Sequence, residues 1–260
     1  MKPSNITSAL AALLKRPFQK LLLRALRDVY RRLDRMDSRL DTVETRLDRV
    51  ESRALSTRAY ALEEIADYLK LACIKGDYYE FGVAQGHVFS FAARLFGLHF
   101  PTMRFLAFDS FEGLPQPTGL DAADNYSGGF AAGEFSCTEP QFISNLSGNN
   151  VDLSRTRTFP GWFDATLNSG DPAIVELGPA AVAWIDCDYY ESTVPVLKFL
   201  TGRLAVGSVI VFDDWGCFRN LPEKGEQRAC KEWLEQHPEI RLHELMSFGW
   251  NGKVFTVGAC

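Results

Sequence analysis

The spacing of apolar residues divides the chain into two parts. From Leu22 to Ala54, apolar side chains recur in alternating steps of four and three residues, which is the heptad pattern of a coiled coil. Beyond residue 60 the pattern changes to short apolar runs separated by helix-like stretches. We therefore predict an amphipathic start and a coiled-coil stalk over residues 1–58, and a globular domain over residues 59–260.

The heptads carry a charge pattern that predicts how chains associate. Residues 33–53 are three copies of one seven-residue unit, with leucine at position a and mostly valine at d. The g positions are arginines and the e positions are acids: Arg32, Arg39, Arg46 and Arg53, then Asp37, Glu44 and Glu51. These charges attract between parallel chains and repel between antiparallel ones. The pattern predicts a parallel homo-oligomer of two to four chains, with a single helix packed on its own domain as the alternative.

A cationic amphipathic stretch precedes the heptads. Between Leu10 and Arg24, leucines interleave with lysines and arginines, and Pro17 interrupts them. Two interpretations stay open: peripheral contact with an acidic membrane at its inner surface, or the start of a helical bundle. We find no cleavage site of a signal peptide and no apolar run of the ~18 residues that span a membrane. The expected location is the cytoplasm.

The second part of the chain alternates between strand-like and helix-like segments. A helix is expected over residues 60–74. Strands are expected over residues 77–83, 103–108, 155–159, 180–185 and 207–212, with further helices over residues 87–96 and 193–204. Such alternation predicts an α/β fold with a parallel sheet covered on both faces. Ligands of such sheets bind at the carboxyl ends of the strands.

Composition and charge exclude several classes of protein. The chain is 46% hydrophobic and 23% charged, as in ordinary globular proteins. Its net charge of −5 combines a basic segment 1–58, with 14 basic and 7 acidic residues, and an acidic segment 59–260, with 14 basic and 26 acidic residues. This acidity argues against a nucleic-acid partner. The six cysteines form no CxxC pair, which argues against zinc and favours reduced thiols.

The first two predicted strands end in residues suited to a nucleotide-like ligand. A glycine-containing turn, Glu80 to Gly86, follows the first strand, and Asp109 with Ser110 follows the second. Glycines let a backbone turn approach a ligand closely, and a carboxylate about 25 residues further on can accept the hydroxyls of a ribose. The alternative for Asp109 is a residue that caps a loop.

The later strands end in acids. Asp186, Asp213 and Asp214 follow two neighbouring strands and should converge, with no Lys or Arg close to them in the sequence. Mg²⁺ or Mn²⁺, which prefer oxygen ligands, would offset their repulsion. The alternative is that some of these acids cap the helices that follow, which suits Asp188 and Glu191 best.

Taken together, the segments EFGVAQG, FDSFEGLP, GWFDATL, IDCDYYEST and VIVFDDW resemble the macrocin O-methyltransferase family of class I S-adenosylmethionine-dependent methyltransferases. The resemblance covers about residues 75–257. It implies a Rossmann-like, mostly parallel sheet that an antiparallel hairpin over residues 241–257 closes.

The same resemblance implies roles for individual residues. Glu80, Gly82 and Gly86 would hold the methionine end of S-adenosylmethionine, Asp109 and Ser110 its ribose, and Trp162 would lie near its adenine, while Asp186, Asp213 and Asp214 would bind magnesium. Catechol-type relatives have a lysine three residues after the first of these acids. Here that position is Tyr189, so a lysine base is not expected.

The expected function is metal-dependent transfer of a methyl group from S-adenosylmethionine to a hydroxyl of a sugar, glycan or glycoside. Asp186 or Asp188 would take the hydroxyl proton. Two alternatives stay open: a phenolic acceptor, or a coiled-coil scaffold of a glycan-assembly complex with secondary catalysis. The segment 118–139, rich in glycine and aromatic residues, would be either a lid over the acceptor or an ordinary loop.

Overall fold

The computed structural model describes residues 29, 32, 36, 55–123 and 126–260. The chain divides into two compact units, Met1–Arg53 and Ala54–Cys260. Residues 55–58, which the apolar pattern assigns to the stalk, are helical and belong to the second unit. The predicted heptads and amphipathic start lie outside the described residues, apart from Val29, Arg32 and Met36, which are helical and exposed.

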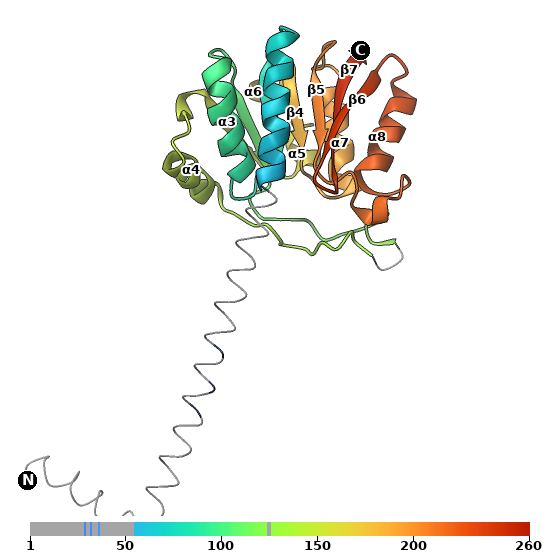
Figure 1. Ribbon diagram of the computed structural model, residues 1–260. Helices are drawn as coiled ribbons and strands as arrows, with labels where there is room; N and C mark the ends of the chain where they lie inside the picture. Colours follow the sequence, from blue (N-terminus) through green and yellow to red (C-terminus); the bar gives the residue numbers. More distant parts are fainter. Residues whose placement is uncertain (1–28, 30–31, 33–35, 37–54, 124–125) are drawn as a thin grey trace, which may run out of the picture. The chain divides into compact units, whose positions relative to one another are not determined.

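The second unit is built on one seven-stranded sheet with the order β3-β2-β1-β4-β5-β7-β6 (Figure 1). The strands are β1 Asp77–Phe81, β2 Phe105–Asp109, β3 Thr156–Pro160, β4 Ala180–Ile185, β5 Val209–Phe212, β6 Arg241–Phe248 and β7 Gly252–Ala259. Strands β1 to β5 are parallel, and β7 pairs antiparallel with both β5 and β6. The predicted α/β class, mostly parallel sheet and closing hairpin are confirmed.

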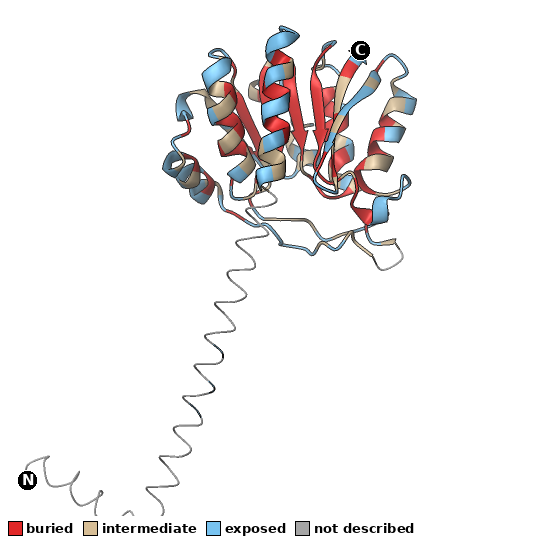
Figure 2. Cartoon of the chain, in the orientation of Figure 1, coloured by how far each residue is buried: buried red, intermediate tan, exposed pale blue. Residues whose placement is uncertain are grey.

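Helices cover both faces of the sheet. One face packs against the helix of residues 55–71, α3 (His87–His99) and α4 (Glu139–Gly148), and the other against α5 (Phe163–Thr166), α6 (Pro172–Val175), α7 (Tyr190–Leu200) and α8 (Gly225–Gln236). Successive strand side chains point to opposite faces, so Tyr78 joins the first core and Tyr79 the second. Figure 2 shows the central strands buried and the helices exposed on their outer sides.

Several helices could not be predicted from the spacing of apolar residues. In α8 the buried side chains include Ala229, Cys230 and Trp233, but most of its other residues are polar or charged. Helices α5 and α6 have four residues each, too few for a helical period to appear. Among the described residues no helix is long and apolar enough to cross a membrane.

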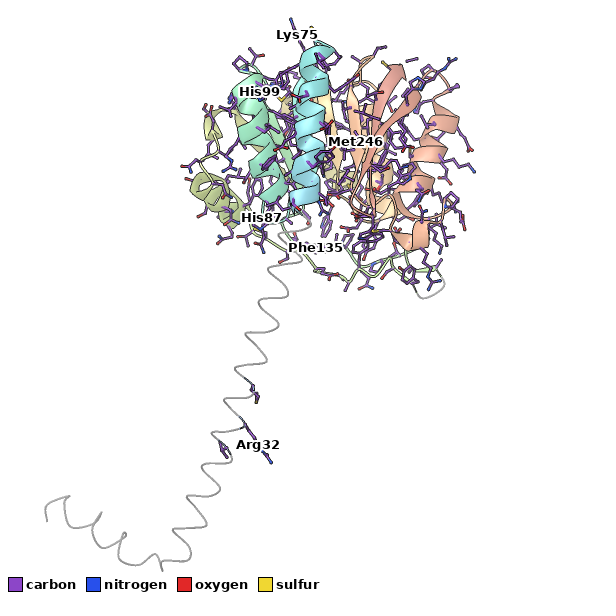
Figure 3. All side chains as sticks on the ribbon, viewed as in Figure 1. Arg32, Lys75, His87, His99, Phe135 and Met246 are labelled. Atoms are coloured by element: carbon purple, nitrogen blue, oxygen red, sulfur yellow. The ribbon has the colours of Figure 1, made fainter. Side chains whose placement is uncertain are left out.

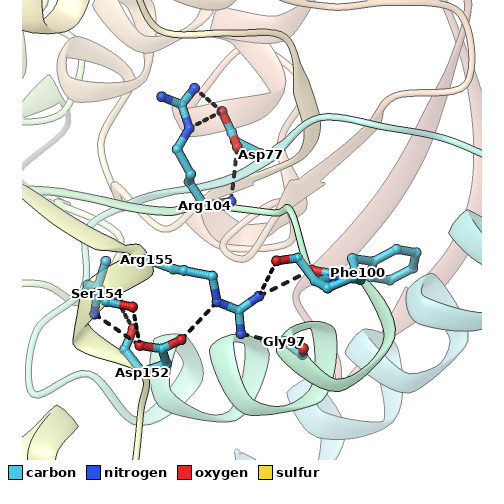
Figure 4. Close-up of polar contacts among 9 residues, drawn as sticks. Asp77, Gly97, Phe100, Arg104, Asp152, Ser154 and Arg155 are labelled. Carbon is cyan, nitrogen blue, oxygen red and sulfur yellow. Dashed lines mark hydrogen bonds and ion pairs between the residues drawn. The ribbon is translucent and has the colours of Figure 1, made fainter.

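Ion pairs fix the amino ends of the strands (Figure 4). Arg104, just before β2, donates from Nε to Asp77 Oδ2 at 3.0 Å and also contacts that oxygen through Nη2. Arg155, just before β3, pairs with Asp152 and donates to the carbonyl oxygens of Gly97 and Phe100. These contacts occupy the edge opposite the strand ends that carry the predicted chemistry.

Candidate active site

The carboxyl ends of the parallel strands meet at one end of the domain. Figure 3 places His87, which begins α3, and Phe135 at this end, and Lys75 and His99 at the opposite end. The described cysteines, six in number, are free thiols.

The glycine turn after β1 has a steric reason for its composition. Gly82 and Gly86 adopt φ of 86° and 81°, a region that favours glycine. A Cβ on Gly82 would lie 1.9 Å from the backbone oxygen of Asp186, so no other residue fits. The turn therefore touches the loop that begins with the first predicted acid.

The residues expected at the ribose build the neighbouring loop. Asp109 Oδ2 accepts hydrogen bonds from the amides of Val83 (2.7 Å) and Ala84 (3.1 Å), and Oδ1 accepts one from Phe111 (2.7 Å). Ser110 Oγ donates to the Gly113 oxygen at 3.0 Å. The loop-capping alternative is thus realised for Asp109. Because a carboxylate oxygen can accept two bonds, Oδ1 still has room for a ribose hydroxyl, and that contact stays a prediction.

Glu80 and Trp162 occupy different environments. Glu80 is 1% exposed and accepts a hydrogen bond from the Tyr78 hydroxyl. Burial raises the pKa of Glu80 well above its usual range, and the bond from Tyr78 opposes this rise. Trp162 is 37% exposed. It follows Gly161, whose amide donates to the backbone carbonyl oxygen of Asp109 at 2.9 Å. Their contacts with a cofactor stay predictions.

A cavity of about 500 Å³ opens beside the glycine turn. Its lining is polar and uncharged: Gln85, Ser136, Cys137, Thr138, Gln141 and Asn145. Asn145 Nδ2 donates to the backbone carbonyl oxygen of Gln85 at 3.0 Å and so joins α4 to the turn. This cavity does not include the acids at the other strand ends.

The structure brings the predicted acids together after β4 and β5. Burial raises the pKa of Asp186, and repulsion from Asp213 and Asp214 raises it further. Burial and the same two neighbours also raise the pKa of Asp188, which is 6% exposed and has a φ of 61°. A non-glycine residue in this region costs about 1 kcal/mol. Both carboxyls therefore hold a proton more strongly than an exposed aspartate does.

Two residues that contact Asp214 in the acid cluster were missed by the sequence prediction. Glu226 Oε2, from α8, accepts the Asp214 amide at 3.0 Å and is 1% exposed. Asn251 Nδ2, from the β6–β7 turn, donates to Asp214 Oδ1 at 3.3 Å. Neither residue lies at the end of a parallel strand, so the strand-end argument could not find them.

The expectation that no basic residue neutralises these acids is wrong. Arg58 Nε donates to Asp213 Oδ2 at 2.6 Å, and Trp184 Nε1 donates to the same oxygen at 3.2 Å. The two partners are 155 residues apart in the chain, which is why the sequence showed no neighbouring base. One signal was present: continuing the heptads places Arg58 at an e position, where the preceding e residues are acids.

The acid cluster has the type of oxygen ligand that a divalent cation prefers, but its side chains are not arranged around one ion. Three buried carboxylate oxygens have no hydrogen-bond partner among the residues that the structure describes, namely Asp213 Oδ1, Asp214 Oδ2 and Glu226 Oε1. Oxygens of this kind are the ligands that Mg²⁺ and Mn²⁺ prefer. Within the described part of the chain, however, no three Asp, Glu, His or Cys side chains are placed to share one ion. The structure instead places the Arg58 guanidinium beside these acids.

The segment expected to be a lid or an ordinary loop is anchored to the site. Asp121 is 1% exposed and accepts the amides of Tyr190 (2.9 Å) and Glu191 (3.0 Å) at the start of α7. Phe130 packs against Tyr189 with ring centroids 5.9 Å apart. Figure 1 shows the described parts of this segment running along the end of the domain where the acids lie.

Comparisons with known proteins identify the fold and the family. NovP, an O-methyltransferase, is 21% identical, with a TM-score of 0.61 over 77% of this chain and 79% of NovP. CalS11, a calicheamicin methyltransferase, gives the same values for identity, TM-score and both coverages. At this identity the likeness shows the fold alone.

A curated relative found by sequence has a higher sequence identity to this chain than these two structures have. It is 8-demethyl-8-(2,3-dimethoxy-alpha-L-rhamnosyl)-tetracenomycin-C 4'-O-methyltransferase of Streptomyces olivaceus, 33% identical over 151 residues. The match covers 55% of this chain and 54% of the relative, so the chain spans about half the length of that protein.

The family profile of the macrocin-O-methyltransferases (TylF) matches residues 34–237, which is most of the chain and includes the glycine turn, Asp109 and the acid cluster. The resemblance seen in the short motifs is thereby confirmed, and the chain belongs to the macrocin O-methyltransferase family.

Proposed function

We propose that the protein transfers the methyl group of S-adenosylmethionine to a hydroxyl of a sugar or glycoside. The observation that carries the proposal is the combination of family membership with a glycine turn in contact with an acid cluster, at the strand ends where this fold binds ligands. The rhamnosyl group in the name of the curated relative supports a sugar acceptor.

The roles of the site residues follow from their positions. S-adenosylmethionine would supply an electrophilic methyl group: the acceptor oxygen bonds to the methyl carbon as the sulfur–carbon bond breaks. Gly82, Gly86 and Asp109 would shape the cofactor side. Asp186 or Asp188 would take the proton that the hydroxyl loses, and a raised pKa makes a carboxylate a stronger general base than an exposed aspartate.

We also propose that Asp186, Asp213 and Asp214 hold Mg²⁺ or Mn²⁺. Such an ion would lower the pKa of the acceptor hydroxyl and fix its oxygen. The unpartnered oxygens of Asp213 and Asp214 support this proposal. For Asp213 to bind the ion in this way, the contact between Arg58 and Asp213 would have to open.

The test is transfer of a tritiated methyl group from S-adenosylmethionine to rhamnosides and, in parallel, to catechols. We expect labelled rhamnosides and loss of labelling in EDTA. The variants Asp186→Asn and Asp188→Asn test the two possible bases, whose loss lowers the rate about 10²- to 10⁴-fold. Because Asp186 is also a proposed metal ligand, a loss in Asp186→Asn indicates the base only if the variant still binds Mn²⁺ with unchanged affinity. The control is Asp164→Asn, since Asp164 is exposed on α5.

Each part of the proposal can fail separately. Absence of S-adenosylmethionine binding in calorimetry would disprove the methyltransferase and leave the scaffold interpretation. Faster labelling of catechols would disprove the sugar acceptor. Full activity in EDTA would disprove the metal requirement.

A further inference from the structure

Arg58 is a partly buried cation that the proposed chemistry does not use. It lies in the helix of residues 55–71, and its side chain is 21% exposed. Its partner Asp213 is fully buried. A lone carboxylate at this depth is costly unless a positive charge accompanies it. Arg58 therefore supplies the charge that Asp213 needs.

The influence of Arg58 extends beyond Asp213. Its positive charge also attracts the carboxylates of Asp186 and Asp214. These three carboxyls are the proposed ligands of the divalent cation. The guanidinium and the cation thus depend on the same negative charges.

The two positive charges exclude each other at this distance. A divalent ion held by Asp213 would add its charge beside the guanidinium, which contacts Asp213 Oδ2 at 2.6 Å. Like charges so close repel strongly, above all where water is excluded. One carboxylate oxygen also has limited capacity, and Asp213 Oδ2 already accepts from Arg58 and Trp184.

The contact between Arg58 and Asp213 uses fewer nitrogen atoms than a comparable ion pair elsewhere in the domain. Arg58 meets Asp213 through Nε, whereas Arg104 grips Asp77 with both Nε and Nη2. A contact through one nitrogen is weaker than the two-nitrogen fork. The partly exposed side chain also has a route to solvent.

We propose that Arg58 is an internal competitor of the divalent cation: its guanidinium neutralises Asp213 until Mg²⁺ or Mn²⁺ takes that carboxylate, and cation binding then releases Arg58. This inference rests on the metal part of the proposed function. It makes Arg58 a residue that sets the affinity for the cation and links the start of the 55–71 helix to the state of the site.

The test is titration of Mn²⁺ into the full chain, followed by the electron paramagnetic resonance signal of the free ion. Arg58→Met should tighten Mn²⁺ binding about tenfold or more, and Arg58→Lys, which keeps the charge but loses the planar guanidinium, should tighten it less. Adding Asp213→Asn to Arg58→Met should abolish the gain. Arg104→Met, which removes a comparable ion pair at the opposite edge of the sheet, should leave the affinity unchanged.

A second measurement uses the unchanged protein and so does not depend on a variant that folds. Saturation with Mg²⁺ should speed amide hydrogen exchange over residues 56–60 and leave exchange around Arg104 unchanged. Equal Mn²⁺ affinity in Arg58→Met and the unchanged protein would overturn the competition while leaving the methyltransferase proposal intact. If neither protein bound Mn²⁺, the metal part of the proposed function would fall together with this inference.

Discussion

At the scale of single residues, buried carboxyls dominate the behaviour of the site. Glu80, Asp188, Asp214 and Glu226 are each at most 6% exposed, and burial is the main reason that the pKa of each is raised. Such groups lower the stability of the folded state when they ionise. A molecule keeps them because of what they bind rather than because of the packing they provide.

Glu80→Gln gives a test of this cost. Between its ordinary pKa of 4.5 and its raised value, the folded state retains a proton that the unfolded state has lost, so rising pH destabilises the unchanged protein. Glutamine has no proton to lose, and its carbonyl can still accept from Tyr78. The stability of the variant relative to the unchanged protein should therefore grow above pH 4.5, by about 1.4 kcal/mol per pH unit until the raised pKa is reached.

The measurement is urea denaturation of both proteins from pH 4.5 to 8. Glu112→Gln, a change at an exposed position, serves as the control and should show no such trend. Parallel stability curves for Glu80→Gln and the unchanged protein would mean that Glu80 is ionised in the folded state.

At the scale of elements, the turns decide whether the strand ends form a site. Gly82→Ala combines an unfavourable φ with the 1.9 Å approach to the Asp186 oxygen. We expect a loss of about 2–5 kcal/mol in the free energy of unfolding. Gly129→Ala has a φ of 101° with open space around it, so it should lose only about 1–2 kcal/mol. Equal losses in denaturant titrations would show that the close approach to Asp186 does not matter.

The segment after β2 makes a second prediction at this scale. Asp121 accepts two amides at the start of α7, so Asp121→Ala removes a helix cap and the anchor of the segment together. We expect a loss of about 0.5–2 kcal/mol in stability and a rise in KM for the acceptor. Asp171→Ala, which removes the cap of the four-residue helix α6, should leave KM unchanged. An unchanged KM in Asp121→Ala would separate the segment from acceptor binding.

The elements also show what the sequence could and could not predict. Strands such as β4 have purely apolar runs because both of their faces are buried, so their bounds were predicted closely. The glycine turn and the acids after β4 and β5 followed from the rule that ligands bind at strand ends. Arg58 and Asn251 could not be found in this way, because each reaches Asp213 or Asp214 from an element distant in sequence. Their positions depend on the packing of the whole domain.

At the scale of the whole molecule, the heptads still await a test. The charge pattern predicts parallel association, and Val29 and Met36, at d positions, are 52% and 58% exposed in the single chain. A chain that begins at Ala54 should still unfold cooperatively in denaturant and should sediment as a smaller oligomer. Leu40→Asp in the full chain should weaken association in the same way. An unchanged mass in both proteins would place the contacts between chains in the globular unit.

The order of the last strands has a consequence for synthesis of the chain. β6 is made before β7 but pairs only with β7, which lies between β5 and β6 in the sheet, so neither β5 nor β6 has this partner until β7 is made. Until then the apolar strand β5, Val209–Phe212, presents an open edge, the kind of edge that recruits strands from other chains. A ribosome that stalls before residue 252 would therefore release an aggregation-prone chain, and translation of β7 protects the domain from that fate.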